Sequence, residues 1–254
     1  MPRTFPKPSK YHVTTSGDIE IATYLGIAQA DQLGSEGNTP PDKEVDEAIV
    51  IVDFGSQYSR LIARRVREAN VYCEIVPHDA PKEAIQHLDI RGVILSGGPS
   101  SVYEEDAPRA PGWVFEIGVP ILGICYGMQL IAHQLGGKVA PGLAREYGYA
   151  VVNRNPEDDV LFQGIDKATP VWMSHGDRID VLPPGFRSIG YTQNSPNAAM
   201  GNGLGLYGIQ FHPEVVHTPQ GSEIIANFVL KICGASGAWT PSNFVSESIE
   251  RIRE

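Results

Sequence analysis

Short apolar runs alternate with segments of helical spacing from residue 48 onward. The continuous apolar run at 48–52 is typical of a strand buried on both faces of a sheet, and residues 92–96 are predicted as a further strand. Between them, residues 59–69 carry apolar side chains on one helical side and arginines on the other. The same patterns predict strands at 71–76 and 119–124 and helices at 81–87 and 113–117. This alternation predicts an α/β fold, a doubly wound, mostly parallel sheet flanked by helices.

The second half of the chain is richer in strands than the first. Extended segments are expected at 149–152, 169–173, 186–191, 198–201 and 206–211. Residues 222–232 then read as a helix that closes the domain, with Gly234 as its C-cap. The later strands follow one another without helices between them, so we expect additional antiparallel strands there.

The two ends of the chain differ from its centre. Residues 1–45 contain proline clusters and the linker-like stretch GSEGNTPP, which predicts a flexible arm with one short helix, although a docked arm is the alternative. The central domain is expected over 46–234. Residues 235–254 read as a linker and the start of a helix, with helical spacing at 243–253.

Composition narrows the classes of partner. The net charge of −10 makes nucleic acid a poor candidate, and no apolar run is long enough to span a membrane. The basic first ten residues precede no apolar segment of a secretory signal. The three cysteines are too scattered for a disulfide framework or a zinc site, so we expect a cytoplasmic protein without a metal ion.

Four polar or glycine-rich stretches follow predicted strands. They are DFGSQY at 53–58, SGGPS at 96–100, GICYGMQ at 123–129 and FHPE at 211–214. Ligands of doubly wound sheets bind at the carboxyl ends of the strands. The sequence therefore predicts that these stretches meet at one edge of the sheet and form its functional site.

Cys125 is the candidate nucleophile. It has glycines two positions before and after it, the spacing of a nucleophile elbow, in which glycines permit a sharp turn between strand and helix. The start of a helix also favours a thiolate, because the positive end of the helix dipole lies there. The alternative is a small buried cysteine in a glycine-rich bend.

His212 and Glu214 complete a candidate triad. His212 ends a predicted strand and could act as the base, and Glu214 could orient its ring. The alternative for this pair is a turn with a solvated carboxylate. The backbone N–H groups of Tyr126 and Gly98 are candidate oxyanion donors. The glycine loop around Gly98 could otherwise be a phosphate cradle or a plain turn.

Taken together, LSGGP, GICYGMQ and FHPE resemble the class I (triad) glutamine amidotransferases over residues 49–234. The stretches IVDFGSQYSRLIARRVRE, REYG, SHGD and HPEVVHTPQG resemble the glutaminase domains of GMP synthases. The final WTPSNFVSESIERIRE resembles the linker helix that leads into the ATP-pyrophosphatase (synthetase) domain of those enzymes. The resemblance implies a flavodoxin-like sheet.

The resemblance also implies chemistry and partners. Cys125, His212 and Glu214 would hydrolyse L-glutamine through a glutamyl thioester, without a cofactor in this domain. Ammonia would pass to a synthetase domain that uses ATP and Mg²⁺ to convert XMP to GMP, and the full enzyme could be a homodimer. The residues implied at the amino-acid end of the substrate are Gln129, Ser174, His175 and Gly176.

Some alternatives remain open from the sequence. Asp177 could face the substrate or another domain, or could cap a turn. The chain could also be the glutaminase of anthranilate or carbamoyl phosphate synthesis, a γ-glutamyl cysteine peptidase, or a catalytically silent binding module. The presence of all three triad residues disfavours the silent module.

Overall fold

The structure is a computed structural model that describes residues 47–155 and 159–241. All of the elements below belong to the compact unit Lys43–Trp239. The predicted arm over 1–45 and the predicted helix over 243–253 lie outside the described residues.

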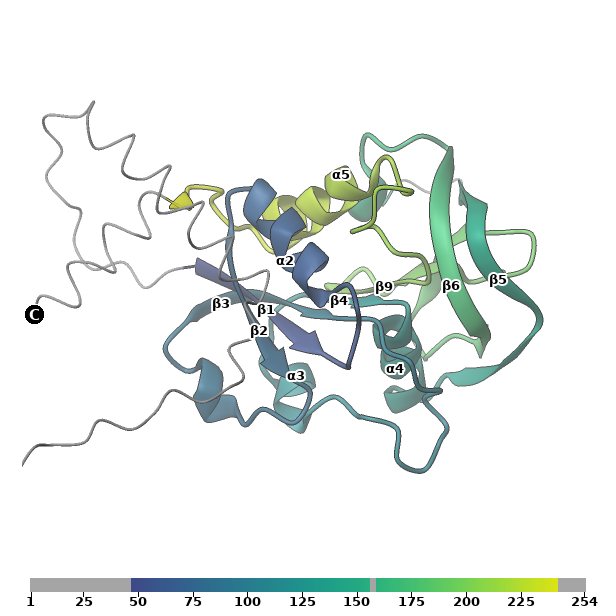
Figure 1. Cartoon of the computed structure of the whole chain (residues 1–254), viewed down its shortest axis with the longest axis horizontal. Coiled ribbons are helices and arrows are strands. Elements are labelled where there is room, and N and C mark those ends of the chain that lie inside the picture. The colour runs from purple at the N-terminus through teal and green to yellow at the C-terminus, as the bar shows by residue number, and fades with distance from the viewer. Residues whose placement is uncertain (1–46, 156–158, 242–254) are drawn as a thin grey trace, which may run out of the picture. The chain divides into compact units, whose positions relative to one another are not determined.

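One mixed sheet organises the described residues (Figure 1). From edge to edge its strands are β2 (Tyr72–Pro77), β1 (Glu47–Asp53), β3 (Asp89–Leu95), β4 (Ile121–Ile124), β9 (Leu206–Ile209), β8 (Ala199–Gly201), β7 (Arg187–Tyr191), β5 (Lys138–Arg154) and β6 (Ala168–Val181). The first five strands pair in parallel. The pairs from β9 to β6 are antiparallel. The predicted α/β class, with additional antiparallel strands in the second half, is confirmed.

Helices cover both faces of the parallel half (Figure 1). One face carries α2 (Ser59–Glu68), α5 (Gly221–Ala226), the π-helical turn η3 (Asn227–Ile232) and the 3₁₀ turn η2 (Val160–Phe162). The other face carries η1 (Lys82–Ile85), α3 (Gly112–Glu116) and α4 (Tyr126–Gln134). Strand β1 contributes side chains to the core on both faces of the sheet. Ile49 and Ile51 pack on the face covered by α2, and Val50 and Val52 pack on the face covered by α4. The continuous apolar run therefore reflects burial on both faces, as predicted.

Several boundaries differ from the sequence expectation. The strand expected at 149–152 is part of the second half of the 17-residue β5. The first half contains Pro141 and Gly142 and so lacks a strand pattern. The helix expected at 81–87 is only the 3₁₀ turn η1. The last helix widens into the π-turn η3, and Gly234 follows it with a φ of +67°, the conformation expected of a glycine C-cap.

The segment after Gly234 folds back toward the start of the sheet. The Trp239 backbone N–H donates to the Asn70 carbonyl oxygen at 3.0 Å, and the indole lies 6.0 Å from the Tyr72 ring. The Ser236 N–H donates to the Glu47 carboxylate at 2.8 Å. Residues 235–239, expected to begin a linker, therefore pack against β1 and β2.

Candidate active site

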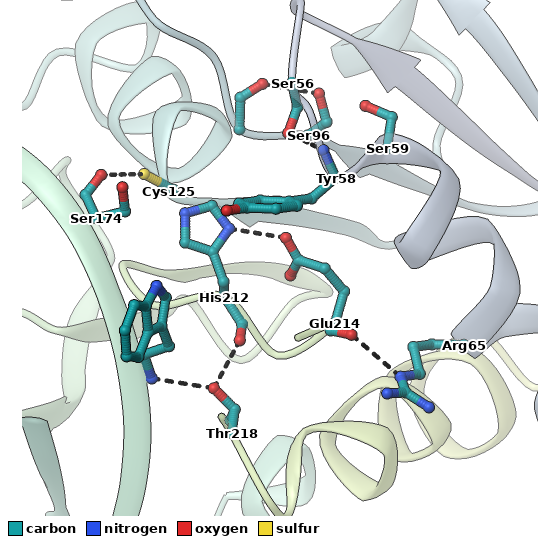
Figure 2. A network of polar contacts seen from close by, with 12 residues as sticks. Ser56, Tyr58, Ser59, Arg65, Ser96, Cys125, Ser174, His212, Glu214 and Thr218 are labelled. Carbon is teal, nitrogen blue, oxygen red and sulfur yellow. Dashed lines mark hydrogen bonds and ion pairs between the residues drawn. The ribbon is translucent and has the colours of Figure 1, made fainter. Parts of the chain in front are cut away.

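The candidate residues meet at the carboxyl ends of the parallel strands (Figure 2). Cys125 follows β4 directly, Ser96 follows β3, and His212 lies three residues after β9. These strands are neighbours in the sheet order, so their ends lie at one edge. The convergence expected from the four polar stretches is thus present in the fold.

Cys125 occupies a strained turn between β4 and α4. Its φ of 52° and ψ of −104° are rarely adopted by a residue with a side chain. A Cβ at Gly123 would lie 2.5 Å from the Gly127 backbone, and a Cβ at Gly127 would lie 2.3 Å from the Leu95 carbonyl oxygen. Both glycines are therefore required for α4 to pack this closely on the sheet. This is the geometry of a nucleophile elbow.

The sulfur of Cys125 lies between two polar groups. It is 3.7 Å from the Ser174 carbonyl oxygen on β6 and 3.7 Å from Nε2 of the fully buried Gln210. The backbone N–H of Cys125 donates to the Ile209 carbonyl oxygen at 2.8 Å. Sheet hydrogen bonding thus fixes the backbone of Cys125, while a carbonyl and an amide face its side chain.

His212 lies between Cys125 and Glu214. Its Nδ1 donates to Glu214 Oε1 at 2.7 Å, and Figure 2 shows the other side of the ring facing the sulfur. Burial alone would lower the pKa of His212, but hydrogen bonds with Cys125 and Glu214, and the charges of both, raise it from 6.5 to about 10. The site therefore favours an imidazolium at neutral pH.

The surroundings of this pair restrict its motion. The Tyr58 ring meets the His212 ring edge-on at 5.3 Å, and Glu214 is 1% exposed. Its second oxygen, Oε2, is buried without a hydrogen-bond partner among the described residues. The Arg65 guanidinium donates to the Glu214 carbonyl oxygen at 3.2 Å. Both members of the pair are therefore held in place, one by an aromatic contact and one through its backbone.

Thr218 fastens the backbone of His212 to β6. Its hydroxyl donates to the His212 carbonyl oxygen at 2.7 Å and accepts from the Trp172 N–H at 3.0 Å. The His212 N–H donates in turn to the Trp172 carbonyl oxygen at 3.0 Å. Because Thr218 is 3% exposed, water does not compete for these bonds. The hydroxyl therefore joins the histidine segment to the antiparallel half of the sheet (Figure 2).

The two candidate oxyanion donors lie together beside the elbow. An ideal Cβ at Gly98 would lie 3.2 Å from the ring of Tyr126 and 2.9 Å from the Phe54 carbonyl oxygen. The neighbouring Gly97 faces the pair itself, since its ideal Cβ would lie 3.2 Å from His212 and 3.9 Å from Cys125. The structure thus brings the glycine loop to the nucleophile, with Gly97 nearer to the imidazole than Gly98.

Gln129 is held inside the protein. Its Nε2 donates to the Asp177 carbonyl oxygen and to Gln210 Oε1, both at 3.2 Å. Gln129 is 4% exposed, and both of its N–H donors are engaged. The amide of Gln129 is therefore fixed between β6 and the segment that leads to His212.

The segment 174–177 on β6 borders the site with its backbone. Ser174 is exposed, whereas His175 is buried and donates from Nδ1 to the Asp177 carbonyl oxygen at 2.8 Å. The other ring nitrogen of His175 lies 3.1 Å from Glu146, which also accepts from Thr192 at 2.8 Å. The side chain of His175 therefore faces the interior and stabilises the strand, and Gly176 beside it is half-buried.

The side chain of Asp177 makes a contact that none of its three sequence interpretations included. One carboxylate oxygen accepts from the Ser101 hydroxyl, and the other accepts from the Tyr103 hydroxyl at 2.9 Å. Both donors belong to the loop that carries Gly98. Asp177 therefore joins β6 to the glycine loop.

Comparison with known proteins agrees with this geometry. The family model described as glutamine amidotransferase class-I matches residues 50–232. This chain belongs to the class I glutamine amidotransferase family. A GMP synthase [glutamine-hydrolyzing] of Dehalococcoides mccartyi (strain ATCC BAA-2266 / KCTC 15142 / 195) is 56% identical over 93% of the chain, and the enzyme of Thermomicrobium roseum is 55% identical over 87%. The chain spans only 43% and 42% of the lengths of these two relatives.

Two solved structures share the fold. A protein of Thermoplasma acidophilum described as one component of a GMP synthase has a TM-score of 0.68 and 32% identity, over 76% of this chain and 96% of its own. A glutamine amidotransferase of Thermotoga maritima has a TM-score of 0.60 and 19% identity, over 75% of this chain and 99% of its own. The second likeness concerns the fold alone.

Three residues of this amidotransferase site were not singled out from the sequence. Gln210 precedes His212 by two positions, so the alternation of an extended segment could have placed it on the same side. Gly97 was passed over in favour of its neighbour Gly98. Thr218 gives no local signal, because its partner Trp172 lies 46 residues away in the chain.

The described residues contain neither a group of side chains suited to a metal ion nor a helix suited to a membrane. Within 47–155 and 159–241, no group of three His, Cys, Asp or Glu side chains is placed to hold a metal ion. In the same part of the amidotransferase chain, no helix has both the length and the apolar character needed to cross a membrane.

Proposed function

We propose that this chain is the glutaminase domain of a GMP synthase. It hydrolyses L-glutamine to glutamate and ammonia, and the ammonia passes to a synthetase partner, an ATP-pyrophosphatase on the same chain or a separate one. That partner uses ATP and Mg²⁺ to aminate XMP to GMP. The relatives named GMP synthase [glutamine-hydrolyzing] support this reading, since they are 56% and 55% identical to the chain and more than twice as long.

One observation carries the proposal: Cys125 sits on a strained elbow and faces His212, which is backed by the buried Glu214. A cysteine, a histidine and an orienting carboxylate in this order form the constellation of nucleophilic acyl transfer. The pKa of His212, raised to about 10, keeps its ring protonated at neutral pH before substrate arrives. The sulfur is thus paired with an imidazolium and ready to attack.

In the first step, the Cys125 sulfur attacks the side-chain amide carbon of glutamine. A carbon–sulfur bond forms, and the carbonyl oxygen gains negative charge as the intermediate becomes tetrahedral. The backbone N–H groups of Tyr126 and Gly98 are the proposed donors to that oxygen. The carbon–nitrogen bond then breaks, and His212 gives its proton to the leaving nitrogen, which departs as ammonia.

In the second step, water hydrolyses the γ-glutamyl thioester. The now neutral His212 takes a proton from the water, and the hydroxyl oxygen bonds to the acyl carbon. The carbon–sulfur bond breaks, glutamate leaves, and the starting thiolate–imidazolium pair is restored. Throughout both steps Glu214 holds Nδ1 of the ring, so that the other nitrogen faces the reacting atoms.

The amino-acid end of glutamine is proposed to lie between Gln129 and β6. The free Oε1 of Gln129 would accept from the substrate ammonium, and the backbone of Ser174, His175 and Gly176 would line the opposite side. The positions of these groups around the sulfur support this placement, because Ser174 already contacts Cys125 at 3.7 Å.

The proposal is tested by measuring glutamate release from L-glutamine, with and without a separately supplied synthetase domain, XMP and ATP. We expect Cys125→Ala to abolish release while the thermal unfolding midpoint stays near that of the wild type. Cys233→Ala, which changes a cysteine distant from the site, is the matched control and should remain active. Full activity in Cys125→Ala would refute the mechanism. Glutamate release that neither supports GMP formation nor responds to the synthetase would refute the GMP synthase assignment alone.

Three expectations from the sequence stay predictions. They are a cytoplasmic location, a homodimer of the full enzyme and the use of ATP and Mg²⁺ only in the synthetase partner. The glutaminase steps themselves use side chains and backbone groups of this chain.

A further inference from the structure

The glycine loop, residues 97–111, joins β3 to α3 and is anchored at two places. Its later half is fastened to α4, because the Tyr126 hydroxyl donates to the Pro108 carbonyl oxygen and Gln134 bonds the backbone N–H of Ala110 at 3.1 Å. These bonds lie ten or more residues after Gly98. On the other side of the glycines, Ser96 is held by backbone hydrogen bonds with Val52 and Gly127, both at 3.0 Å. The residues just after Gly98 have a further anchor of their own.

That anchor is the carboxylate of Asp177. It accepts from Ser101, three residues after Gly98, and from Tyr103 at 2.9 Å. Each hydroxyl bonds a different oxygen, so the carboxylate holds the loop at two points. Hydrogen bonds to an ionised acceptor are roughly twice as strong as those between neutral groups. Since Tyr103 is 46% exposed, the contact can also open to solvent.

The backbone of Asp177 is tied to the substrate side of the site. Its carbonyl oxygen accepts from Gln129 at 3.2 Å and from His175 at 2.8 Å. Three residues earlier on the same strand, the Ser174 carbonyl oxygen contacts the Cys125 sulfur. A single residue therefore links the glycine loop to the strand that borders the nucleophile.

We infer that Asp177 is a positioning residue: its carboxylate fastens the glycine loop to β6 and thereby sets where the loop's backbone N–H groups lie relative to Cys125. The inference rests on the proposed function. It implies that Asp177 contributes to stabilising the transition state by positioning the loop, and not by binding glutamine or by contacting another domain. The oxyanion is absent from the bound substrate and develops in the transition state and the tetrahedral intermediate, so a misplaced loop lowers kcat and leaves KM nearly unchanged.

The first test measures amide hydrogen exchange of the glycine loop in the whole chain. Asp177→Ala removes both acceptors, and we expect exchange at 98–104 to accelerate by roughly tenfold. The double variant Ser101→Ala/Tyr103→Phe leaves β6 intact and should accelerate exchange to the same degree. The matched control is Asp180→Asn, which alters an exposed ion pair with Arg178 on the same strand. This control should leave the exchange of the loop unchanged. Unchanged exchange in both loop variants would overturn the inference.

The second test measures steady-state glutamine hydrolysis by the same variants. We expect kcat to fall roughly 10- to 100-fold in Asp177→Ala, less than the 10²–10³ lost with an oxyanion donor itself, and KM to stay within about twofold. The triple variant Asp177→Ala/Ser101→Ala/Tyr103→Phe should have the same kcat as Asp177→Ala, because all three substitutions break the same contact. Faster exchange with an unchanged kcat would overturn the positioning role. A wild-type chain that releases no glutamate would refute the proposed function, while the exchange experiment would still decide whether the contact holds the loop.

Discussion

Removing the charge of Glu214 is the most direct test of why the pKa of His212 is raised. Glu214→Gln keeps an oxygen that can accept from His212 Nδ1 but removes the negative charge 2.7 Å away. The rise in the pKa of His212 from 6.5 to about 10 corresponds to about 5 kcal/mol in favour of the imidazolium, at about 1.4 kcal/mol per pH unit. Burial opposes this rise, so Glu214 and Cys125 together supply all of it. Without the charge, the pKa of His212 should move back toward 6.5.

The consequence for catalysis is a shift of the alkaline limb of the pH profile. The imidazolium is lost as pH rises through the pKa, so wild-type kcat/KM should decline only near pH 10. In Glu214→Gln the decline should begin at lower pH, and at pH 9 kcat/KM should be reduced by roughly 10- to 100-fold. The assay is glutamate release from pH 6 to 10.5. Glu74→Gln, beside the exposed His87 at 3.0 Å, is the matched control and should leave the profile unchanged.

Unfolding experiments on the same variants supply an independent measurement. Because the folded pKa lies above the unfolded value, protonated His212 stabilises the fold fully below pH 6.5 and loses that contribution as pH rises through 10. The loss of stability in Glu214→Gln should therefore be largest near pH 6 and shrink toward pH 10.5. A loss of about 1–3 kcal/mol in the free energy of unfolding should remain at every pH. The new amide NH₂ would occupy the buried position of Oε2, where it would find no hydrogen-bond acceptor in the part of the chain that the structure describes. An unshifted alkaline limb together with a pH-independent loss of stability would refute the reasoning.

Three further predictions concern the elbow and the backbone of the histidine. Thr218→Val should lower kcat/KM roughly tenfold and Thr218→Ser should restore it to within about twofold, as measured by glutamate release, because the hydroxyl bonds both the His212 carbonyl oxygen and the Trp172 N–H of β6. Gly127→Ala should destabilise the fold by about 1–3 kcal/mol or more in urea unfolding. Gly112→Ala should change stability by less than about 1 kcal/mol, because its added Cβ would meet only the end of the Glu116 side chain, at an ordinary contact distance of 3.7 Å. Cys125→Gly should be inactive yet about 1 kcal/mol more stable than Cys125→Ala, since only glycine adopts a φ of 52° there without strain.

The parallel half of the sheet was predictable because its signal is local. Strands β1, β3 and β4 are buried on both faces, and burial of this kind leaves a continuous apolar run in the sequence. Strand β5 was predicted only in its last part. Its first half pairs with β6 across register shifts and carries proline and glycine, so its extended form depends on the partner strand.

The same distinction applies to the site. Cys125 and His212 could be predicted as candidates because each lies in a motif at the end of a strand, where doubly wound sheets bind their ligands. Thr218 and the carboxylate contacts of Asp177 were not found, because they join backbone and side chains that are 46 and 76 residues apart. No periodicity or local spacing encodes which distant donor a buried hydroxyl or carboxylate will meet.

The strain at Cys125 is intelligible from the elements around it. The Cys125 N–H is bonded to Ile209 on β9, and the close approach of Gly123 and Gly127 fixes the direction in which α4 leaves the turn. A backbone held from both sides can keep a conformation that would relax elsewhere. Strand β9 leads in turn to His212, so the nucleophile and its base are carried by neighbouring parallel strands that pair residue by residue. Their spacing is therefore a property of the sheet and cannot adjust. The glycine loop is held by side-chain hydrogen bonds from Asp177, Tyr126 and Gln134 instead of a strand ladder, so single side-chain substitutions can change its position.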